Sequence, residues 1–246
     1  GVQLRTIPGK RGAMEPAAVE AAIRPHDIHF PPTGLICVEN THNRAGGAVI
    51  PISNMSALAA IGKKYSVPLH LDGARIFNAA YALNTSAQEI AAYFDSVSCC
   101  LSKGLAAPVG SIIVGRKEWI ERARKWRKRL GGGMRQAGVL AAAGIVALEK
   151  MIDRLPEDHK LAKYLAAGLA EIPQLEVTPP DTNIVLVDVK QTRLTASDMV
   201  YRLADQGVLV TAFGPSTIRL VTHKDVDRGA ADWVLTAMKN IIAGEA

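Results

Sequence analysis

The chain has 246 residues, of which 48% are hydrophobic and 21% are charged. This balance is that of an ordinary globular protein, and it excludes a wholly disordered chain, a collagen and a small disulfide-rich domain. Aromatic residues make up only 5% of the chain, so the core must be built from Ala, Val, Ile and Leu, as in many α/β proteins.

The net charge is +6, from 29 Lys and Arg against 23 Asp and Glu. Much of this excess lies in the run 116–129, where Glu118 and Glu121 are the acidic residues among many cations. Such a run has three possible interpretations: a solvated helix face, a site for a phosphate-bearing cofactor, or a surface that binds nucleic acid. We expect no nucleic-acid partner, because such a surface leaves the candidate catalytic residues described below unexplained.

The three cysteines are Cys37 and the adjacent pair Cys99 and Cys100. An odd number without regular spacing predicts neither a disulfide framework nor a metal site. Each cysteine lies in an apolar run, so we expect small buried core residues in a reducing compartment. No signal-peptide pattern and no apolar run of about 18 residues is present, so we expect a cytoplasmic protein without a membrane partner.

Strand and helix patterns alternate along the first half of the chain. This β-α-β order predicts an α/β fold, with a mostly parallel sheet and helices on both of its faces. In chain order, we predict a helix at 16–23, a strand at 35–39, a helix at 53–64, a strand at 67–72, helices at 74–83 and 86–93, and strands at 96–101 and 111–115.

The pattern changes to long helices after residue 117 and then to a mixture of strands and helices. We place a domain boundary near Pro156, between a cofactor-binding domain of residues 1–155 and a small α+β domain of residues 156–246. The elements predicted in this half are helices at 118–130, 134–155 and 157–170, a strand at 183–189, a helix at 196–206, strands at 208–211 and 217–221, and a helix at 224–242.

Two charged residues end neighbouring predicted strands: Asp72 in HLDGAR and Lys103 in SVSCCLSK. Ligands of open α/β sheets gather at the carboxyl ends of the strands. A lone lysine there is usually a solvated surface residue, but a carboxylate and a lysine together suit pyridoxal phosphate. The lysine forms a Schiff base with the aldehyde, and the carboxylate keeps the pyridine nitrogen protonated. We expect Gly73 and Gly104 to leave room for the flat ring.

Five ordered stretches carry a resemblance to a known family. They are ENTHNRAGG (39–47), HLDGARIFNA (70–79), CLSKGLAAPVGS (100–111), WRKRLGGGMRQAG (126–138) and IRLVTH (218–223). Together they resemble the L-threonine aldolase family over nearly the whole chain. The resemblance implies a pyridoxal-phosphate enzyme of the aspartate aminotransferase fold type, which is fold type I.

The resemblance also implies roles for single residues. Lys103 is implied as the Schiff-base lysine and Asp72 as the partner of the pyridine nitrogen. The resemblance implies that Arg75 lies near the cofactor ring and the substrate carboxylate. It also implies that the guanidinium of Arg219 binds that carboxylate. Taken alone, Arg75 is typical of a surface cation on a helix, and Arg219 of an edge strand.

Three further residues follow from the same resemblance. Arg135 is implied at the cofactor phosphate, on a neighbouring subunit, with Lys128 before it. His29 in DIHF matches a family histidine near the hydroxyl of the substrate and is a candidate base. Taken alone, His29 is more often a structural histidine, and Gly131–Gly133 is more often a flexible hinge than an anion-binding turn.

The activity implied is retro-aldol cleavage of L-threonine, L-allo-threonine and related β-hydroxy-α-amino acids to glycine and an aldehyde, such as acetaldehyde. The alternatives are another pyridoxal-phosphate lyase, such as a β-eliminating one, and an inactive aldolase fragment. Family members begin with a segment that supplies a phosphate cradle and a stacking histidine, whereas Gly1 resembles a point inside the large domain. We therefore expect an incomplete large domain.

The family commonly has Gly where this chain has Ala106, and we expect the extra methyl group to change little. The resemblance further implies a homo-oligomer, a dimer or a tetramer built from dimers, with active sites shared between subunits.

Overall fold

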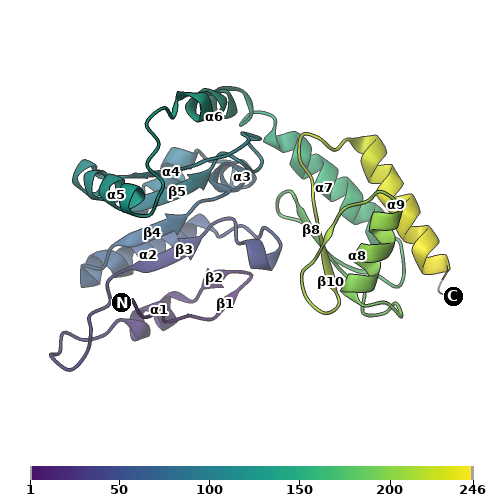
Figure 1. Cartoon of the computed structure of the whole chain (residues 1–246). Coiled ribbons are helices and arrows are strands. Elements are labelled where there is room, and N and C mark those ends of the chain that lie inside the picture. The colour runs from purple at the N-terminus through teal and green to yellow at the C-terminus, as the bar shows by residue number, and fades with distance from the viewer. Residues whose placement is uncertain (1, 245–246) are drawn as a thin grey trace. The chain divides into compact units, whose positions relative to one another are not determined.

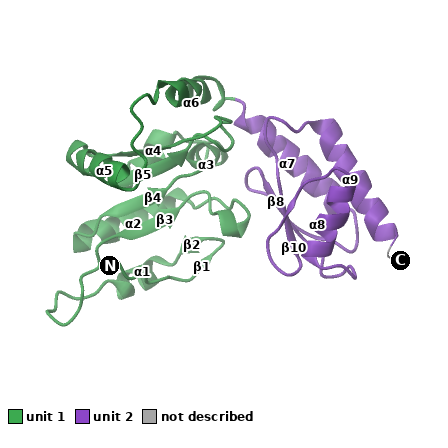
Figure 2. Ribbon diagram, viewed as in Figure 1, with its two compact units in different colours: residues 1–153 green, residues 154–246 purple. Residues whose placement is uncertain are grey.

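The computed structural model describes residues 2–244. The chain forms two compact units, residues 1–153 and residues 154–246, which are shown in Figures 1 and 2. Each unit has its own hydrophobic core cluster, so we describe each by itself. Among the described residues, no helix combines the length and the apolar character that crossing a membrane requires.

The centre of the first unit is a four-stranded sheet. Its strands are β3 (Ile36–Glu39), β4 (Leu69–Asp72), β5 (Ser96–Cys100) and β6 (Ser111–Gly115), in the order β3-β4-β5-β6. β3, β4 and β5 run parallel, and β6 pairs antiparallel with β5. The prediction of a mostly parallel sheet is confirmed.

Alternate residues of these strands build the core of the first unit. Ile36, Val38, Leu71 and Val97 are each less than a tenth exposed and belong to one cluster. This follows from the period of two in a strand, which sends every second side chain to the same face. The helices that contribute to the cluster are α1 (Pro16–Ala22), α2 (Ile52–Tyr65), α3 (Ile76–Ala82) and α4 (Ala87–Ala91).

The same period of two corrects the expectation for the cysteines. Cys37 lies between Ile36 and Val38, so it points to the other face of the sheet and is exposed. Cys99 and Cys100 are half-buried. The expectation of a buried core residue is wrong for Cys37, because an apolar run was taken as evidence of burial on both faces.

A hairpin near the N-terminus was not predicted. It consists of β1 (Gly9–Lys10) and β2 (Ala13–Met14), joined by the two-residue turn Arg11–Gly12. Both turn residues have positive φ, 52° at Arg11 and 88° at Gly12. This is the geometry of a type I′ turn, which usually carries Asn, Asp or Gly at its first position. Arg11 hides that signal in the sequence.

The helical region after β6 is shorter than predicted. After α5 (Lys117–Arg129), the next helix is α6 (Gly138–Lys150) and not a helix over 134–155. The chain turns at 151–154 and begins a new helix at Leu155. Pro156 lies in the first turn of that helix, where its missing N–H costs no hydrogen bond.

The second unit contains an antiparallel sheet in the order β7-β8-β10-β9. Its strands are β7 (Glu176–Thr178), β8 (Ile184–Asp188), β9 (Thr211–Ala212) and β10 (Thr217–Val221). β7 was not predicted, and β9 is shorter than the predicted strand over 208–211. This composition is the small α+β arrangement that the sequence indicated.

Three helices accompany this sheet: α7 (Leu155–Ala170), α8 (Ala196–Asp205) and α9 (Arg228–Ala243). α9 begins later than predicted because Asp227 accepts the N–H of Ala230 and caps the helix there. The core that these elements share with the sheet includes Leu169, Val185, Val187, Met199, Leu203, Ile218 and Met238.

A buried histidine makes the stability of the second unit depend on pH. His159 lies in α7 and is 2% exposed. Burial, assisted by the charge of Lys163, lowers the pKa of His159 to about 4. Because the same histidine in the unfolded chain has a pKa of about 6.5, the unfolded state binds more protons than the folded state between about pH 4 and pH 6.5. The loss of stability between pH 7 and pH 4 is therefore about 3 kcal/mol for this group.

We expect His159→Gln to remove this loss. Urea unfolding at pH 7 and near pH 4 should show a smaller decrease in the free energy of unfolding for the variant than for the unmodified chain. Other titrating groups, such as Asp158, are present in both proteins and cancel in the comparison. Equal decreases in the two proteins would contradict this account of His159.

Candidate active site

The ends of the parallel strands lie together at one edge of the sheet of the first unit. In the register of this sheet, Glu39 of β3 pairs with Asp72 of β4, and Asp72 pairs with Ser98 of β5. Lys103 follows β5, in the loop 101–110 that leads into the antiparallel β6. Since β5 leaves the sheet and β6 enters it at this edge, the loop places Lys103 on the same edge as Asp72.

The loop that carries Lys103 has a defined backbone. The N–H of Leu101 donates to the carbonyl of Gly110 at 2.9 Å, and the N–H of Ala106 donates to the carbonyl of Lys103 at 2.8 Å. Leu105 is 3% exposed and anchors the loop in the interior, whereas Lys103 itself is exposed. The loop therefore fixes the backbone of Lys103 while its side chain is accessible to a ligand.

Asp72 is held by the turn that follows β4. Its Oδ1 accepts the N–H of Ala74 at 3.1 Å, and the carboxylate is exposed. The N–H of Gly73 donates to the carbonyl of Ser98 at 2.8 Å, and a Cβ at Gly73 would lie 2.9 Å from that oxygen. Gly73 therefore serves the close approach of β4 to β5. The expectation that it leaves room for a ring is wrong.

A polar network beside Asp72 was not found from the sequence. Glu39 accepts the N–H of Asn43 at 2.9 Å, and its other oxygen lies 3.7 Å from Nε2 of His42. Asn43 accepts a hydrogen bond from Nη1 of Arg75 at 3.5 Å. The network thus connects the loop after β3 to the residue that precedes α3. Glu39 ends its strand as Asp72 does, and that position was the signal available in the sequence.

A pocket of about 430 Å³ lies at this edge, between the unpredicted hairpin and the ends of the strands. Gly12 packs so closely on the ring of His42 that a side chain there would collide with it. The volume is within the range of small-molecule sites. The lining residues are Ile7, Gly9, Gly12, Met14, Cys37, Val38, Glu39, His42 and Asp72.

His70 lies on β4 two residues before Asp72. Its Nδ1 is 2.8 Å from Oγ of Ser96. Burial lowers the pKa of His70, although the charge of Asp72 opposes this effect. No chemistry is expected of His70, and its contact with Ser96 agrees with a neutral, structural ring.

His29 is not at this edge in the structure. The loop 24–35 leads into the amino end of β3, whereas Asp72 and Lys103 follow the carboxyl ends of their strands. The His29 side chain is 77% exposed, and its Nδ1 lies 2.7 Å from Oδ1 of Asp27. A role for His29 as a base stays a prediction.

Lys128 and Arg135 lie near the end of α5 and in the segment that follows it, and both are exposed. The side chain of Lys128 folds over Gly133, where a Cβ would collide with it. The absence of a side chain at Gly133 thus allows the Lys128 side chain to lie against the backbone there. Contact of these residues with a cofactor phosphate stays a prediction.

Arg219 belongs to the second unit. It lies on β10, opposite Leu186 of β8 and Thr211 of β9. Its guanidinium lies over the ring of Phe213, 4.9 Å from the ring centre. A contact between Arg219 and a substrate carboxylate also stays a prediction.

The carboxylate and the amine at this edge of the first sheet have the chemistry that binding of pyridoxal phosphate requires. A carboxylate ends β4 and an amine lies in the loop after the neighbouring β5, so Asp72 and Lys103 are the residues that would hold it. Asp72 also lines the pocket, whereas Lys103 is not among its lining residues. Among residues 2–244, no three His, Cys, Asp or Glu side chains are grouped to hold a metal ion.

Comparison with known proteins places the chain among enzymes. The model of the family described as beta-eliminating lyase matches residues 1–192. The chain is 44% identical to the probable low-specificity L-threonine aldolase 2 of Arabidopsis thaliana over 247 residues, which covers 98% of this chain and 70% of that protein.

Solved structures agree on the fold. A threonine aldolase from Leishmania major superposes with a TM-score of 0.78 at 18% identity, covering 96% of this chain and 70% of that one. Aspartate aminotransferase from Thermus thermophilus superposes with a TM-score of 0.70 at 18% identity, covering 96% of this chain and 60% of that one. The predicted aspartate aminotransferase fold type is confirmed, and the chain spans between 60% and 70% of the length of these three proteins.

The loop that carries Lys103 contains a strained residue. Ala106 has a φ of 58°, in the left-handed region that favours glycine. The expectation that the methyl group of Ala106 changes little is therefore wrong, because its left-handed backbone makes a Cβ costly there. We expect Ala106→Gly to stabilise the first unit by about 0.5–1 kcal/mol, because removing the Cβ relieves more strain than the added freedom of the unfolded chain costs.

Thermal melting of the variant beside the unmodified chain tests this expectation. Ala107→Gly is the matched control, since Ala107 is the next residue of the loop, is 7% exposed and is not among the residues with positive φ. The control should melt at a lower temperature and Ala106→Gly at a higher one. A lower melting temperature for Ala106→Gly would contradict the assignment of strain.

Proposed function

Because this chain belongs to the beta-eliminating lyase family, and within it to the L-threonine aldolases, we propose that it cleaves L-threonine, L-allo-threonine and related β-hydroxy-α-amino acids to glycine and an aldehyde. The observation that carries the proposal is that Asp72 ends β4 and Lys103 lies in the loop after the neighbouring parallel strand β5, at the same edge of the sheet. The names of the relatives support the choice of substrate.

Pyridoxal phosphate, when bound, supplies an acceptor for the electron pair released as the Cα–Cβ bond of the substrate breaks. The Asp72 carboxylate would hold a proton on the ring nitrogen, a role that suits an acceptor fixed by the N–H of Ala74. The Lys103 amine would hold the aldehyde carbon and later move a proton at Cα of the product.

The substrate carboxylate needs a cation that also fixes its orientation. Arg75 is half-buried, and Asn43 accepts a hydrogen bond from it, so its guanidinium is held at the same edge as Asp72. A planar guanidinium binds a carboxylate through two parallel hydrogen bonds. Arg75 would thereby select which bond at Cα faces the electron acceptor. Arg219 is the second guanidinium proposed for this carboxylate.

We expect Lys103→Ala to lower glycine formation from threonine by at least roughly 100-fold in the presence of added pyridoxal phosphate, because the variant lacks both the covalent attachment and the proton donor. The visible absorbance band of lysine-bound pyridoxal phosphate should also disappear. Lys63→Ala is the control, since Lys63 is an exposed lysine of α2, and it should keep both properties.

The products distinguish the alternatives. Glycine formation retained in Lys103→Ala would refute the assigned lysine. Pyruvate and ammonia, in place of glycine and an aldehyde, would indicate a β-eliminating lyase. An unmodified chain that binds pyridoxal phosphate and forms neither set of products would be an inactive fragment.

We further propose that the protein is a homo-oligomer that associates through α6. This helix is largely apolar, yet Gly144 and Ala147 are its buried residues. Val139 is 80% exposed, and Ile145 and Val146 are each 54% exposed. An exposed apolar helix of this kind is typical of a surface that a partner covers, and the family resemblance makes a second copy of the chain the partner.

Val139→Glu is expected to reduce the molar mass in solution, measured by light scattering during size-exclusion chromatography, because it places a charge in the interface. Since Val139 is exposed, the fold of the single chain should be unaffected. Tyr201→Glu, at a 69% exposed position of α8, is the control and should leave the mass unchanged. Equal masses for both variants and the unmodified chain would exclude α6 as the interface.

A further inference from the structure

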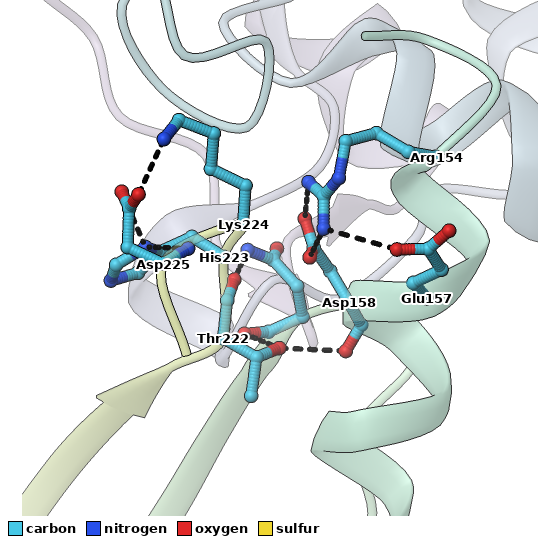
Figure 3. Close-up of polar contacts among 8 residues, drawn as sticks. Arg154, Glu157, Asp158, Thr222, His223, Lys224 and Asp225 are labelled. Carbon is cyan, nitrogen blue, oxygen red and sulfur yellow. Dashed lines mark hydrogen bonds and ion pairs between the residues drawn. The ribbon is translucent and has the colours of Figure 1, made fainter. Parts of the chain in front are cut away.

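A buried ion pair lies at the start of the second unit. Arg154 directly precedes α7, and Asp158 lies on its first turn. Figure 3 shows their side chains facing each other. Nη2 of Arg154 is 2.6 Å from Oδ1 of Asp158, and Nη1 donates to Oδ2 at 3.1 Å. The two parallel contacts fix the orientation of both groups.

The pair is removed from water. The side chain of Asp158 is 2% exposed and that of Arg154 is 18% exposed. Burial raises the pKa of Asp158 although the charge of Arg154 opposes this effect. Buried ion pairs contribute little net stability, because desolvation offsets their attraction, whereas they can specify one arrangement of the chain.

The backbone of Asp158 holds the end of β10. Oγ1 of Thr222 donates to the Asp158 carbonyl at 2.6 Å, as Figure 3 shows. The residue before the neighbouring strand β8 closes the arrangement: the N–H of Thr222 donates to the Asn183 carbonyl at 3.0 Å, and Nδ2 of Asn183 donates to the Thr222 carbonyl at 2.8 Å. Asp158, Thr222 and Asn183 are each at most 3% exposed.

Arg219 lies on the strand that this arrangement holds. Thr222, Leu220 and Ile218 point to the buried side of β10, so Arg219 points to the opposite face. There it lies over Phe213. A strand moves as a unit over three residues, so fixing Thr222 to α7 also fixes the direction in which Arg219 projects.

We propose that Arg154, Asp158 and Thr222 are positioning residues that set where Arg219 presents its guanidinium to a substrate carboxylate. This inference rests on the proposed aldolase function. The residues touch neither substrate nor cofactor. They act by tying the carboxyl end of β10 to the segment through which the second unit continues from the first.

Thr222→Val and Thr222→Ser test the link, because valine keeps the volume of threonine and serine keeps its hydroxyl. Valine removes the hydroxyl hydrogen bond and serine keeps it. For Thr222→Val, we expect hydrogen exchange of the peptide covering residues 217–222 to be about fivefold faster, the size of one lost hydrogen bond. Thr222→Ser should exchange like the unmodified chain. This measurement needs no catalytic activity.

The kinetic effect should appear in KM. A carboxylate is unchanged by the reaction, so a contact to it is equally strong before and during bond cleavage. Thr222→Val should therefore raise KM for threonine about fivefold, with kcat within about twofold of the unmodified chain. Thr222→Ser should restore the original KM.

A double-mutant cycle shows whether the effect passes through Arg219. Arg219→Met keeps much of the apolar stem and removes the guanidinium, so it should raise KM by itself. In that background, Thr222→Val should add no further increase. An equal further increase would overturn the inference, as would unchanged exchange and unchanged KM in Thr222→Val.

The ion pair has its own matched control. Asp158→Asn removes the charge that faces Arg154, and Asp232→Asn removes the equivalent charge of the exposed i,i+4 pair Arg228–Asp232 in α9. We expect faster exchange at 217–222 and a higher KM for Asp158→Asn, and neither change for Asp232→Asn. Equal effects of both variants would overturn the role of the buried pair.

The outcomes separate this inference from the function on which it rests. A chain that forms no glycine from threonine contradicts the proposed function, while the exchange of residues 217–222 still decides whether Thr222 holds the strand. If Arg219→Met leaves KM unchanged in an active chain, Arg219 is not the carboxylate ligand and the inference is overturned.

Discussion

The parallel pairing of β3, β4 and β5 is the constraint on which the candidate site depends. It brings the loop after β3, the turn after β4 and the loop after β5 to one edge of the sheet. The register aligns Glu39, Asp72 and Ser98. A shift by one residue would turn Leu71 out of the core and Asp72 into it, so the packing of the apolar face also fixes the position of the carboxylate.

Both units use polar contacts to hold segments that carry candidate ligands. In the first unit, Glu39 and Asn43 connect the loop after β3 to Arg75. In the second, Thr222 connects the end of β10 to the carbonyl of Asp158. Buried or half-buried contacts of this kind specify one arrangement because an alternative leaves a donor or an acceptor without a partner. The supporting residues thereby define the site as much as the residues that would touch a ligand.

Much of the fold followed from local patterns in the sequence. Alternating strands and helices predicted the parallel sheet, and Asp72 and Lys103 were predicted as site residues because they lie where apolar strands end. The predictions failed where a single residue hides the pattern or where burial depends on the other face. Arg11 hides a type I′ turn, and Cys37 is exposed although its strand is apolar. The predicted helix over 134–155 is replaced by α6, which ends at Lys150, because residues 151–154 turn before the next helix begins at Leu155.

The sequence by itself determined the order of the elements, the two charged residues at strand ends and the motifs of the family, since each of these is a pattern of near neighbours. The tertiary structure alone decided which distant residues meet. Asn43 and Arg75 are 32 residues apart, and Thr222 and Asp158 are 64 residues apart. Such contacts depend on which strands pair and which helix packs beside them, and the spacing of residues along a chain does not encode those choices locally.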